Sequence, residues 1–356
     1  MELQLYWIGN DSMKRNEKET RVFMSKNRVI NVKISPESDS SSYLHISESN
    51  SIFGNCMFHH EREFQDYDFW ILLHDFTYDG TVICPPENTI FVTGEPASVK
   101  KYSSKFLKQF ATIVTSQEGL SHSNVIETHQ VLSWGFHKSY DELNQMKPFE
   151  KSKFMSIVSS NKRFSKGHEQ RYQFAKNLKR HFGDTIDLYG RGICDFESKW
   201  DVIAPYMFSI AVENSSSKNY ITEKLTECFL SYTFPLYYGC PNVDDYYPKG
   251  SYEWIDISDK EGSVDLIEKI RHDPNYYQKH LPAVCDARKR YLDQYDLYPL
   301  LAGIIANLDE KKEVYGSNKK MQISPAGMKL SDLAFKGRCV AGIIKNAIDN
   351  ELHKSS

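Results

Sequence analysis

The chain has 356 residues, 44 of them basic and 47 acidic, which gives a formal net charge of −3 at pH 7. This length is sufficient for two domains, and the balanced charge excludes the strong positive field that nucleic-acid-binding proteins carry. The seven cysteines are widely scattered and form no C-x-x-C pair, so we expect reduced thiols rather than a disulfide framework or a zinc site. Neither a signal peptide nor an apolar run of about 18 residues is recognisable, and we therefore expect a cytoplasmic protein with at most peripheral membrane contact.

Short apolar runs separated by polar segments make up the first half of the chain. Their length is typical of buried strands, which we predict at residues 3–8, 29–34, 69–73, 89–93, 110–115 and 131–134. We predict a short basic helix over residues 102–109 and a linker over the charged stretch 138–153. His74 and Glu95 each follow a predicted strand closely. His74 is a candidate for contact with an acceptor, whereas Glu95 is either a turn residue or a carboxylate that projects between two domains.

The second half repeats this alternation with longer helices. We predict strands at 154–158, 208–212, 234–238 and 254–257, and helices at 167–182, at 264–270, within 274–295, at 300–308 and at 337–353. Two alternating β/α halves joined by a linker indicate an α/β fold in which two Rossmann-like domains face each other across a cleft.

The stretch 208–240 carries the strongest functional signal. A buried strand is followed by Glu213 and Asn214, then by a polar loop and by Thr222, a residue type that favours the N-cap of a helix. Lys224 lies in the first helical turn, where its charge opposes the positive end of the helix dipole. An anion shared between Lys224 and the free backbone N–H groups would remove this conflict. The alternatives are a phosphate-bearing donor site at the carboxyl end of the strand and ordinary strand–loop–helix architecture.

Part of this stretch, VENSSSKNYITEKLTECFLSYTFPLYYG, resembles the donor-binding signature of the α1,3/α1,4-fucosyltransferases of glycosyltransferase family 10, in their bacterial form. The family pattern is an E-N pair, a short variable loop, Y-x-T-E-K, a helix and a P-[IVL]-Y-x-G strand. Every fixed position is filled, by Glu213, Asn214, Tyr220, Thr222, Glu223, Lys224, Pro235, Tyr237 and Gly239. The resemblance implies a GT-B fold, with an acceptor-binding domain over residues 1–145, a domain for the GDP-sugar donor over 146–320 and a helical tail over 321–356 that packs back on the first domain.

The resemblance also implies how the donor diphosphate is bound. It matches Arg171 to an arginine, early in a helix, that contacts the diphosphate, with Lys162 and Arg163 as fallback positions. Arginine suits this role because its guanidinium binds phosphate oxygens in pairs and remains charged. Lys224 and the helix N-terminus would share in stabilising the leaving diphosphate.

The remaining signature residues are implied to contact other parts of the donor. Asn214 and Tyr220 would contact the nucleotide, and Glu223 would accept hydrogen bonds from ribose or sugar hydroxyls. Glu213 could instead be oriented towards the fucose and its developing positive charge, so the division of contacts between Glu213 and Glu223 stays open. Because protein cations can neutralise a diphosphate in GT-B sites, we expect no obligatory metal, and we expect Mn²⁺ or Mg²⁺ only to stimulate.

Glu95, in the run Phe91-Val92-Thr93-Gly94-Glu95, matches the general base proposed for this family. The implied reaction is an inverting transfer of L-fucose from GDP-β-L-fucose to a glycan hydroxyl, whose proton Glu95 would accept. The expected acceptor is an N-acetyllactosamine-type glycan of a surface polysaccharide or lipopolysaccharide, modified at O3 of GlcNAc as in Lewis antigens. The alternatives are a transferase for another GDP-deoxysugar, a retaining GT-B glycosyltransferase and a non-catalytic protein that binds a nucleotide sugar.

Overall fold

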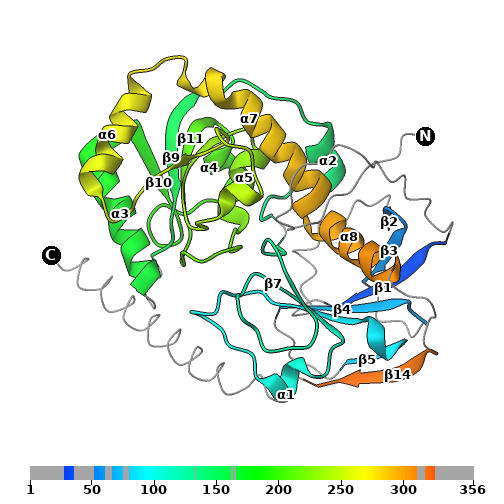
Figure 1. The fold of residues 1–356 in the computed structure, drawn as a ribbon. Helices are drawn as coiled ribbons and strands as arrows, with labels where there is room; N and C mark the ends of the chain where they lie inside the picture. The colour runs from blue at the N-terminus through cyan, green and yellow to red at the C-terminus, as the bar shows by residue number, and fades with distance from the viewer. Residues whose placement is uncertain are drawn as a thin grey trace, which may run out of the picture.

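The computed structural model describes residues 28–35, 52–60, 66–74, 80–132, 134–161, 163, 166–310 and 317–324. The strand predicted at residues 3–8, the helix predicted at 337–353 and the fallback residue Lys162 lie outside these ranges. Within them, the chain forms two units, each built on a parallel sheet, which occupy the lower and upper parts of Figure 1.

The first unit contains a seven-stranded sheet with the order β2-β3-β1-β4-β6-β7-β8. All neighbouring strands are parallel except β2 and β3. The strands are β1 (Ile30–Ser35), β2 (Ile52–Phe53), β3 (Cys56–His59), β4 (Phe69–Leu73), β6 (Thr89–Val92), β7 (Thr112–Thr115) and β8 (Val125–Glu127). The structure thus confirms the strands predicted near residues 29–34, 69–73, 89–93 and 110–115 and adds β2, β3 and β8.

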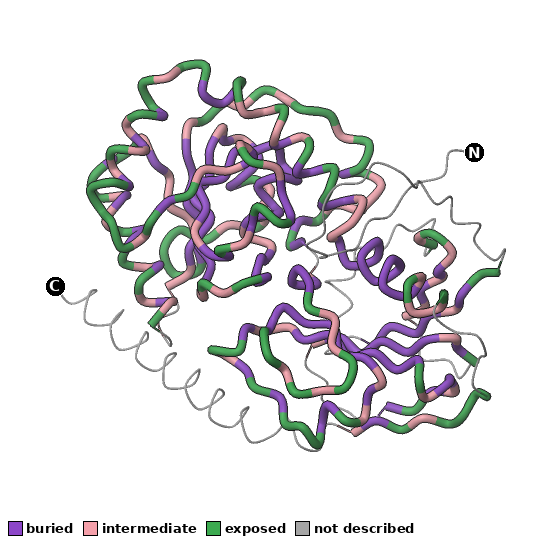
Figure 2. The backbone as a smooth tube through the Cα atoms, in the orientation of Figure 1, coloured by how far each residue is buried: buried purple, intermediate pink, exposed green. Residues whose placement is uncertain are grey.

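Burial on both faces explains the continuous apolar runs of this sheet. Ile71 of β4 belongs to the core that the sheet forms with α8 (Leu297–Glu310), whereas the preceding Trp70 lies in a second core on the opposite face. That second core includes α1 (Ser104–Leu107) and a small antiparallel sheet of β5 (Gly80–Cys84) and β14 (Lys319–Ile323). A parallel sheet covered in this way needs apolar side chains at successive positions, and Figure 2 shows the buried residues concentrated in the strands and in α8.

The second unit contains a five-stranded, fully parallel sheet with the order β10-β9-β11-β12-β13. Its strands are β9 (Lys153–Val158), β10 (Ile186–Tyr189), β11 (Tyr206–Val212), β12 (Phe234–Tyr238) and β13 (Glu253–Trp254). The helices are α3 (Lys166–Phe182), α4 (Lys199–Ile203), α5 (Glu223–Leu230), α6 (Lys260–Arg271) and α7 (Tyr276–Arg290), which continues as a π-helical turn over Tyr291–Tyr295. Within the described ranges, no helix combines the length and the apolar character needed to cross a bilayer.

The strand predicted at residues 131–134 is wrong. The described residues of this segment are not in a strand, because their carbonyl groups are hydrogen-bonded to side chains from distant parts of the chain instead of to a neighbouring strand. The His74 ring lies 2.9 Å from the Val131 carbonyl oxygen, and the Tyr291 hydroxyl donates to the Leu132 carbonyl oxygen at 3.1 Å. The following stretch 138–153 does connect the two sheets, as predicted, but includes the short helix α2 (Tyr140–Gln145).

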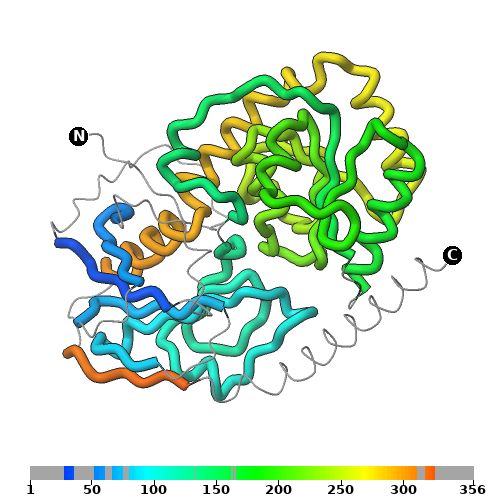
Figure 3. The backbone as a smooth tube through the Cα atoms, turned by 180° about the vertical axis from the view of Figure 1, so that it is seen from behind, coloured from blue at the N-terminus to red at the C-terminus, as the bar shows by residue number. Residues whose placement is uncertain are grey.

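The chain returns to the first unit after Asp296. Helix α7 and the π-helical turn belong to the second unit, whereas α8 packs on the first sheet and β14 pairs with β5. Figure 3 shows the orange helix α8 beside the blue strands of the first unit. The predicted boundaries place this return at residue 321, and the structure has it at residue 297. The tail predicted to pack back on the first domain lies largely outside the described residues.

The carboxyl ends of the two sheets face each other. Ser98, in the loop after β6, lies with its hydroxyl 3.2 Å from the hydroxyl of Ser215, in the loop after β11. The Gln130 N–H, beyond β8, donates to the Asn219 carbonyl oxygen at 3.1 Å. Two Rossmann-like units that meet through the loops at their strand carboxyl ends form the GT-B arrangement, so the fold predicted from the sequence is confirmed.

We predict that Asp296, at this crossing, makes stability depend on pH. Burial raises the pKa of its carboxyl group to about 7 from an ordinary value of 3.8, although N–H groups of Leu297 and Tyr298 donate to it. The folded state therefore holds this proton more tightly, so the stabilisation is complete below pH 4 and is lost as the pH rises to 7. Relative to Asp296→Asn, which stays neutral, the wild-type free energy of unfolding should fall by up to about 4 kcal/mol over this window.

Urea denaturation of both proteins at intervals between pH 4 and pH 8 measures this difference. A difference that does not change with pH would contradict the buried, protonated carboxyl group.

Candidate active site

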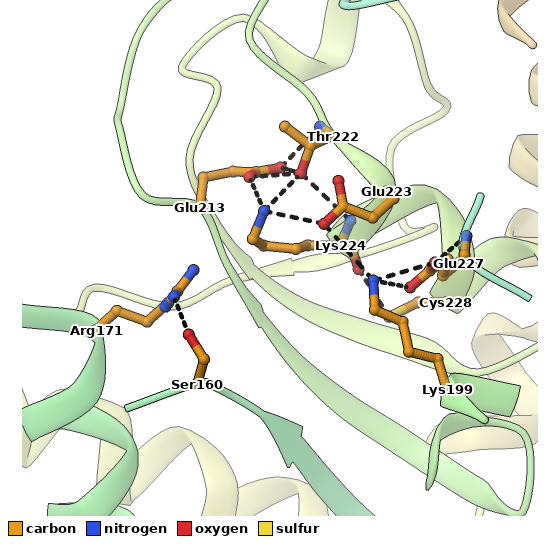
Figure 4. A network of polar contacts seen from close by, with 10 residues as sticks. Ser160, Arg171, Lys199, Glu213, Thr222, Glu223, Lys224, Glu227 and Cys228 are labelled. Carbon is orange, nitrogen blue, oxygen red and sulfur yellow. Dashed lines mark hydrogen bonds and ion pairs between the residues drawn. The ribbon is translucent and has the colours of Figure 1, made fainter. Parts of the chain in front are cut away.

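Glu213, directly after β11, is the centre of a buried polar cluster (Figure 4). Its side chain is fully buried, and its carboxylate accepts hydrogen bonds from the Thr222 N–H at 2.8 Å and from the Thr222 hydroxyl at 2.7 Å. The Lys224 ammonium lies 3.2 Å from the same carboxylate and donates to the Thr222 hydroxyl at 2.9 Å. Thr222 is the N-cap of α5, as predicted, because its hydroxyl also accepts from the Lys224 N–H. The cluster thereby fixes the start of α5 against the end of β11.

Gly239, after β12, makes room for this arrangement. A Cβ atom at this position would overlap the side chain of Glu213 and the hydroxyl of Tyr237. A similar restriction applies to Gly167, at the beginning of α3, where a Cβ would overlap the carbonyl oxygen of Asn214. Glycine at both positions lets β12 and α3 approach the segment that carries Glu213 and Asn214.

Glu223 and Glu227, one turn apart on α5, share a second lysine. The Lys199 ammonium, from α4, lies 3.0 Å from the Glu227 carboxylate and 3.6 Å from that of Glu223. Burial raises the pKa of Glu223, but the attraction of Lys224 and Lys199 outweighs it and lowers this pKa well below its ordinary range. For Lys224 the signs are opposite. Burial lowers its pKa, but the attraction of Glu213 and Glu223 outweighs burial and raises it. Glu223 and Lys224 are therefore charged at neutral pH.

Arg171, on α3, is the cation at this edge that lacks a carboxylate contact among the described residues. Only 7% of the residue is exposed, one guanidinium nitrogen lies 3.4 Å from the Ser160 hydroxyl, and Nε has no hydrogen-bond partner within the described part of the chain. Burial lowers the pKa of Arg171 more than Glu213 and Glu223 raise it. Two further buried atoms near this edge, Ser159 Oγ and Asn214 Oδ1, also lack partners within those ranges. Buried polar atoms without partners are costly, so this group has the chemistry of a ligand site.

The first unit contributes Glu95, in the loop after β6. The carbonyl oxygen of Glu95 accepts a hydrogen bond from the Gln117 side chain at 2.6 Å, which fixes the backbone of this loop. Tyr220, from the second unit, is buried, and its hydroxyl is hydrogen-bonded to Asn214. Burial raises the pKa of Tyr220 well above its ordinary value, and the charges of Glu213 and Glu95 add to the shift. Glu95 therefore lies near the donor-signature residues.

The loop between Glu213 and Thr222 is held by Asn219. Its backbone has a positive φ of 61°. Its N–H donates to the Asn242 side chain at 2.9 Å, the Asn242 amide donates back to its side-chain oxygen at 2.9 Å, and the Tyr246 hydroxyl donates to the same oxygen at 2.6 Å. These contacts fix the loop that carries Tyr220.

The structure brings the predicted site residues to two facing edges. The donor-signature residues lie together at the carboxyl edge of the second sheet, and the predicted base lies opposite: Arg171, Glu213, Asn214, Tyr220, Glu223 and Lys224 on one side, Glu95 on the other. The fallback residue Arg163 instead pairs with Glu169 at 2.6 Å. His74, the candidate for acceptor contact, uses one ring nitrogen to hold the Val131 carbonyl group.

Sequence reasoning missed Lys199 and Glu227. Glu227 is four residues after Glu223 and only 1% exposed, and a carboxylate on the buried face of an amphipathic helix is a signal that a buried cation must lie nearby. Nothing near Lys199 in the sequence identifies it as that cation. Among the described residues, no group of three His, Cys, Asp or Glu side chains is placed to hold a metal ion.

Part of the chain that contains this site is similar to known proteins. Residues 148–288 match the model for the C-terminal domain of glycosyltransferase family 10 (fucosyltransferase). These residues form a family 10 domain. The segment contains every donor-signature residue named above and leaves Glu95 outside.

Individual relatives match over shorter stretches. The α-(1,3)-fucosyltransferase FucT of Helicobacter pylori is 29% identical over 82 residues, which are 23% of this chain and 17% of that protein. An α-(1,4)-fucosyltransferase of Arabidopsis thaliana is 33% identical over 122 residues, 31% of this chain and 30% of that protein. The matched segments thus span less than a third of these relatives. A crystal structure of an α1,3-fucosyltransferase with GDP-fucose aligns with 86% of this chain and 96% of its own, at 16% identity and a TM-score of 0.46.

We predict that the Thr222 hydroxyl stabilises the family 10 domain. Thr222→Ala removes the N-cap of α5 and a donor to the buried Glu213 carboxylate. The free energy of unfolding should fall by about 1–3 kcal/mol, as measured by urea denaturation. Thr222→Ser keeps the hydroxyl and is the matched control. An equal loss in the serine variant would assign the effect to the methyl group and contradict the role of the hydrogen bonds.

Proposed function

We propose that the protein is an inverting fucosyltransferase that moves L-fucose from GDP-β-L-fucose to a hydroxyl of a glycan acceptor. Membership of residues 148–288 in family 10 supports the sugar and the donor. The observation that carries the proposal is Arg171, a buried guanidinium at the carboxyl edge of the second sheet whose Nε has no hydrogen-bond partner among the described residues. A buried cation of this kind suits a diphosphate, whose oxygens accept its hydrogen bonds.

Lys224 would contact both the diphosphate and two carboxylates. Its place in the first turn of α5 predicted a bound anion, but Glu213 and Glu223 already lie 3.2 and 3.3 Å from its ammonium. A diphosphate would therefore compete with these two carboxylates for Lys224, whereas Arg171 has no carboxylate contact among the described residues and its Nε has no partner there. As the bond between fucose and GDP breaks, negative charge grows on the leaving diphosphate, and both cations would stabilise it. Because the protein supplies this positive charge, we propose that no divalent ion is obligatory and that Mn²⁺ or Mg²⁺ only stimulates.

Glu95 is proposed as the general base. It comes from the opposite unit and lies near Tyr220, so an acceptor bound between the units would meet the donor there. A carboxylate in this position can accept the proton of the attacking hydroxyl while that oxygen bonds to the anomeric carbon from the face opposite GDP. Attack from this face converts the β-linked donor into an α-linked product. We further propose an N-acetyllactosamine-type acceptor of a surface glycan, with transfer to O3 of GlcNAc.

The remaining contacts follow from position. Asn214, whose Oδ1 has no partner in the part of the chain that the structure describes, and Tyr220 would contact the nucleotide. Glu223, of which 27% of the side chain is exposed, is the carboxylate within reach of donor hydroxyls. Glu213 is fully buried and occupied by Thr222 and Lys224, so we assign it to holding the site together instead of contacting the fucose.

The proposal predicts that Glu95→Gln loses turnover and keeps donor binding. We would incubate the protein with GDP-fucose and N-acetyllactosamine, in the presence of EDTA, and measure acceptor-dependent GDP release. The rate for Glu95→Gln should fall by about 10²- to 10⁴-fold, because only the proton acceptor is removed. The affinity for GDP, measured by calorimetry, should change by less than about threefold, since a change of this size is below 1 kcal/mol.

Glu87→Gln is the matched control, because Glu87 is exposed and precedes β6, at the opposite end of this strand from Glu95. The anomeric signals of the product in a nuclear magnetic resonance spectrum distinguish an α- from a β-fucoside, and a β-product would contradict inversion. Release of GDP from another GDP-deoxysugar alone would establish that donor instead. Binding of GDP-fucose without turnover of any acceptor would favour the non-catalytic alternative, and no binding of GDP-fucose or GDP would contradict the donor site.

A further inference from the structure

Lys199 occupies an unusual position behind the proposed donor site. It is the first residue of α4, on a different element from the donor signature, and 27% of its side chain is exposed. Its ammonium lies 3.2 and 3.0 Å from the two oxygens of Glu227 and 3.6 Å from Glu223 Oε1 (Figure 4). An ammonium group has three protons, so two suffice for Glu227 and the third is available to Glu223.

Lys199 is not the sole hydrogen-bond donor to the Glu227 carboxylate. Its Oε1 also accepts a hydrogen bond from the Gly135 N–H at 2.7 Å, in the connection between the two units. Glu223 and Glu227, four residues apart on one helix face, repel each other when both are ionised. A cation between them removes this repulsion and holds the Glu223 carboxylate at a fixed place.

Glu223 Oε1 is thus shared between two lysines. Lys224 lies 3.3 Å from this oxygen and Lys199 lies 3.6 Å from it. Without Lys199, Glu223 would attract Lys224 alone, and this lysine would be held more firmly away from a bound diphosphate. With Lys199 present, a second cation partly neutralises the negative charge of Glu223, and the attraction of Glu223 for Lys224 is weaker.

We infer that Lys199 is a positioning residue for the donor site, which holds Glu223 from behind and thereby leaves the Lys224 ammonium available to a nucleoside diphosphate. This inference rests on the proposed function. It assigns to a residue outside the donor signature an effect on donor affinity, and it predicts no effect on the affinity for the acceptor.

The experiment must separate this role from the neutralisation of buried Glu227. Lys199→Met alone removes both interactions, and it leaves the Glu227 carboxylate buried without its cation, so loss of stability is expected as well. The decisive protein is the double variant Lys199→Met with Glu227→Gln. Its glutamine needs no cation and can still accept from the Gly135 N–H, so thermal stability should return to within a few degrees of that of Glu227→Gln alone.

GDP affinity, measured by calorimetry on the full chain, is the readout. The double variant should bind GDP roughly tenfold more weakly than Glu227→Gln, which is a difference of about 1.4 kcal/mol in binding free energy. Lys199→Arg, which keeps the charge, should stay within about threefold of the wild type. Equal affinity of the double variant and Glu227→Gln would overturn the inference and leave Lys199 as a partner of Glu227 only.

Three further outcomes bear on the inference. If the methionine variant does not fold, Lys199→Gln with Glu227→Gln replaces the ion pair by two amides and carries the same comparison. If wild-type protein binds no GDP, the proposed function fails, and this inference fails with it. If wild type binds GDP and only the comparison of the two variants fails, the proposed function stands.

Discussion

The contact between the Glu213 carboxylate and Thr222 is the interaction on which the rest of the site depends. It joins the end of β11 to the first residues of α5 by two hydrogen bonds from one residue, in a place where Glu213 is 1% exposed. A buried carboxylate must be compensated, and here the compensation comes from the N-cap of a helix and from Lys224. The same contact therefore determines where α5 begins and where Lys224 lies. It also explains why residue 239 is a glycine, since a Cβ atom there would overlap the Glu213 side chain.

The same constraint places the lysines of the candidate site. In the structure, Lys224 and Lys199 are placed among three carboxylates, Glu213, Glu223 and Glu227. Such a cluster holds charged groups in fixed positions in a partly buried place, so the proposed reaction would need little reorganisation of them as charge develops. Arg171, from a separate helix, completes the set from the other side and is the cation whose Nε remains without a partner within the described ranges.

Several strands and the start of α5 could be predicted from the sequence because their signals are local. The strands at 69–73 and 234–238 have the predicted bounds, and Thr222 is the N-cap of α5 as predicted. Contacts between distant segments were not predictable. The segment 131–134 has the composition of a strand, but His74 and Tyr291 form hydrogen bonds with its carbonyl groups. Lys199 reaches Glu223 from a short helix that precedes it by more than twenty residues, and no spacing rule connects the two.

A crystal structure of the protein with GDP tests the central claim most directly. The account predicts that oxygens of the diphosphate lie within about 3 Å of both the Arg171 guanidinium and the Lys224 ammonium, at the edge formed by β9, β11 and the start of α5. A diphosphate that contacts neither side chain, or GDP bound elsewhere on the molecule, would contradict it.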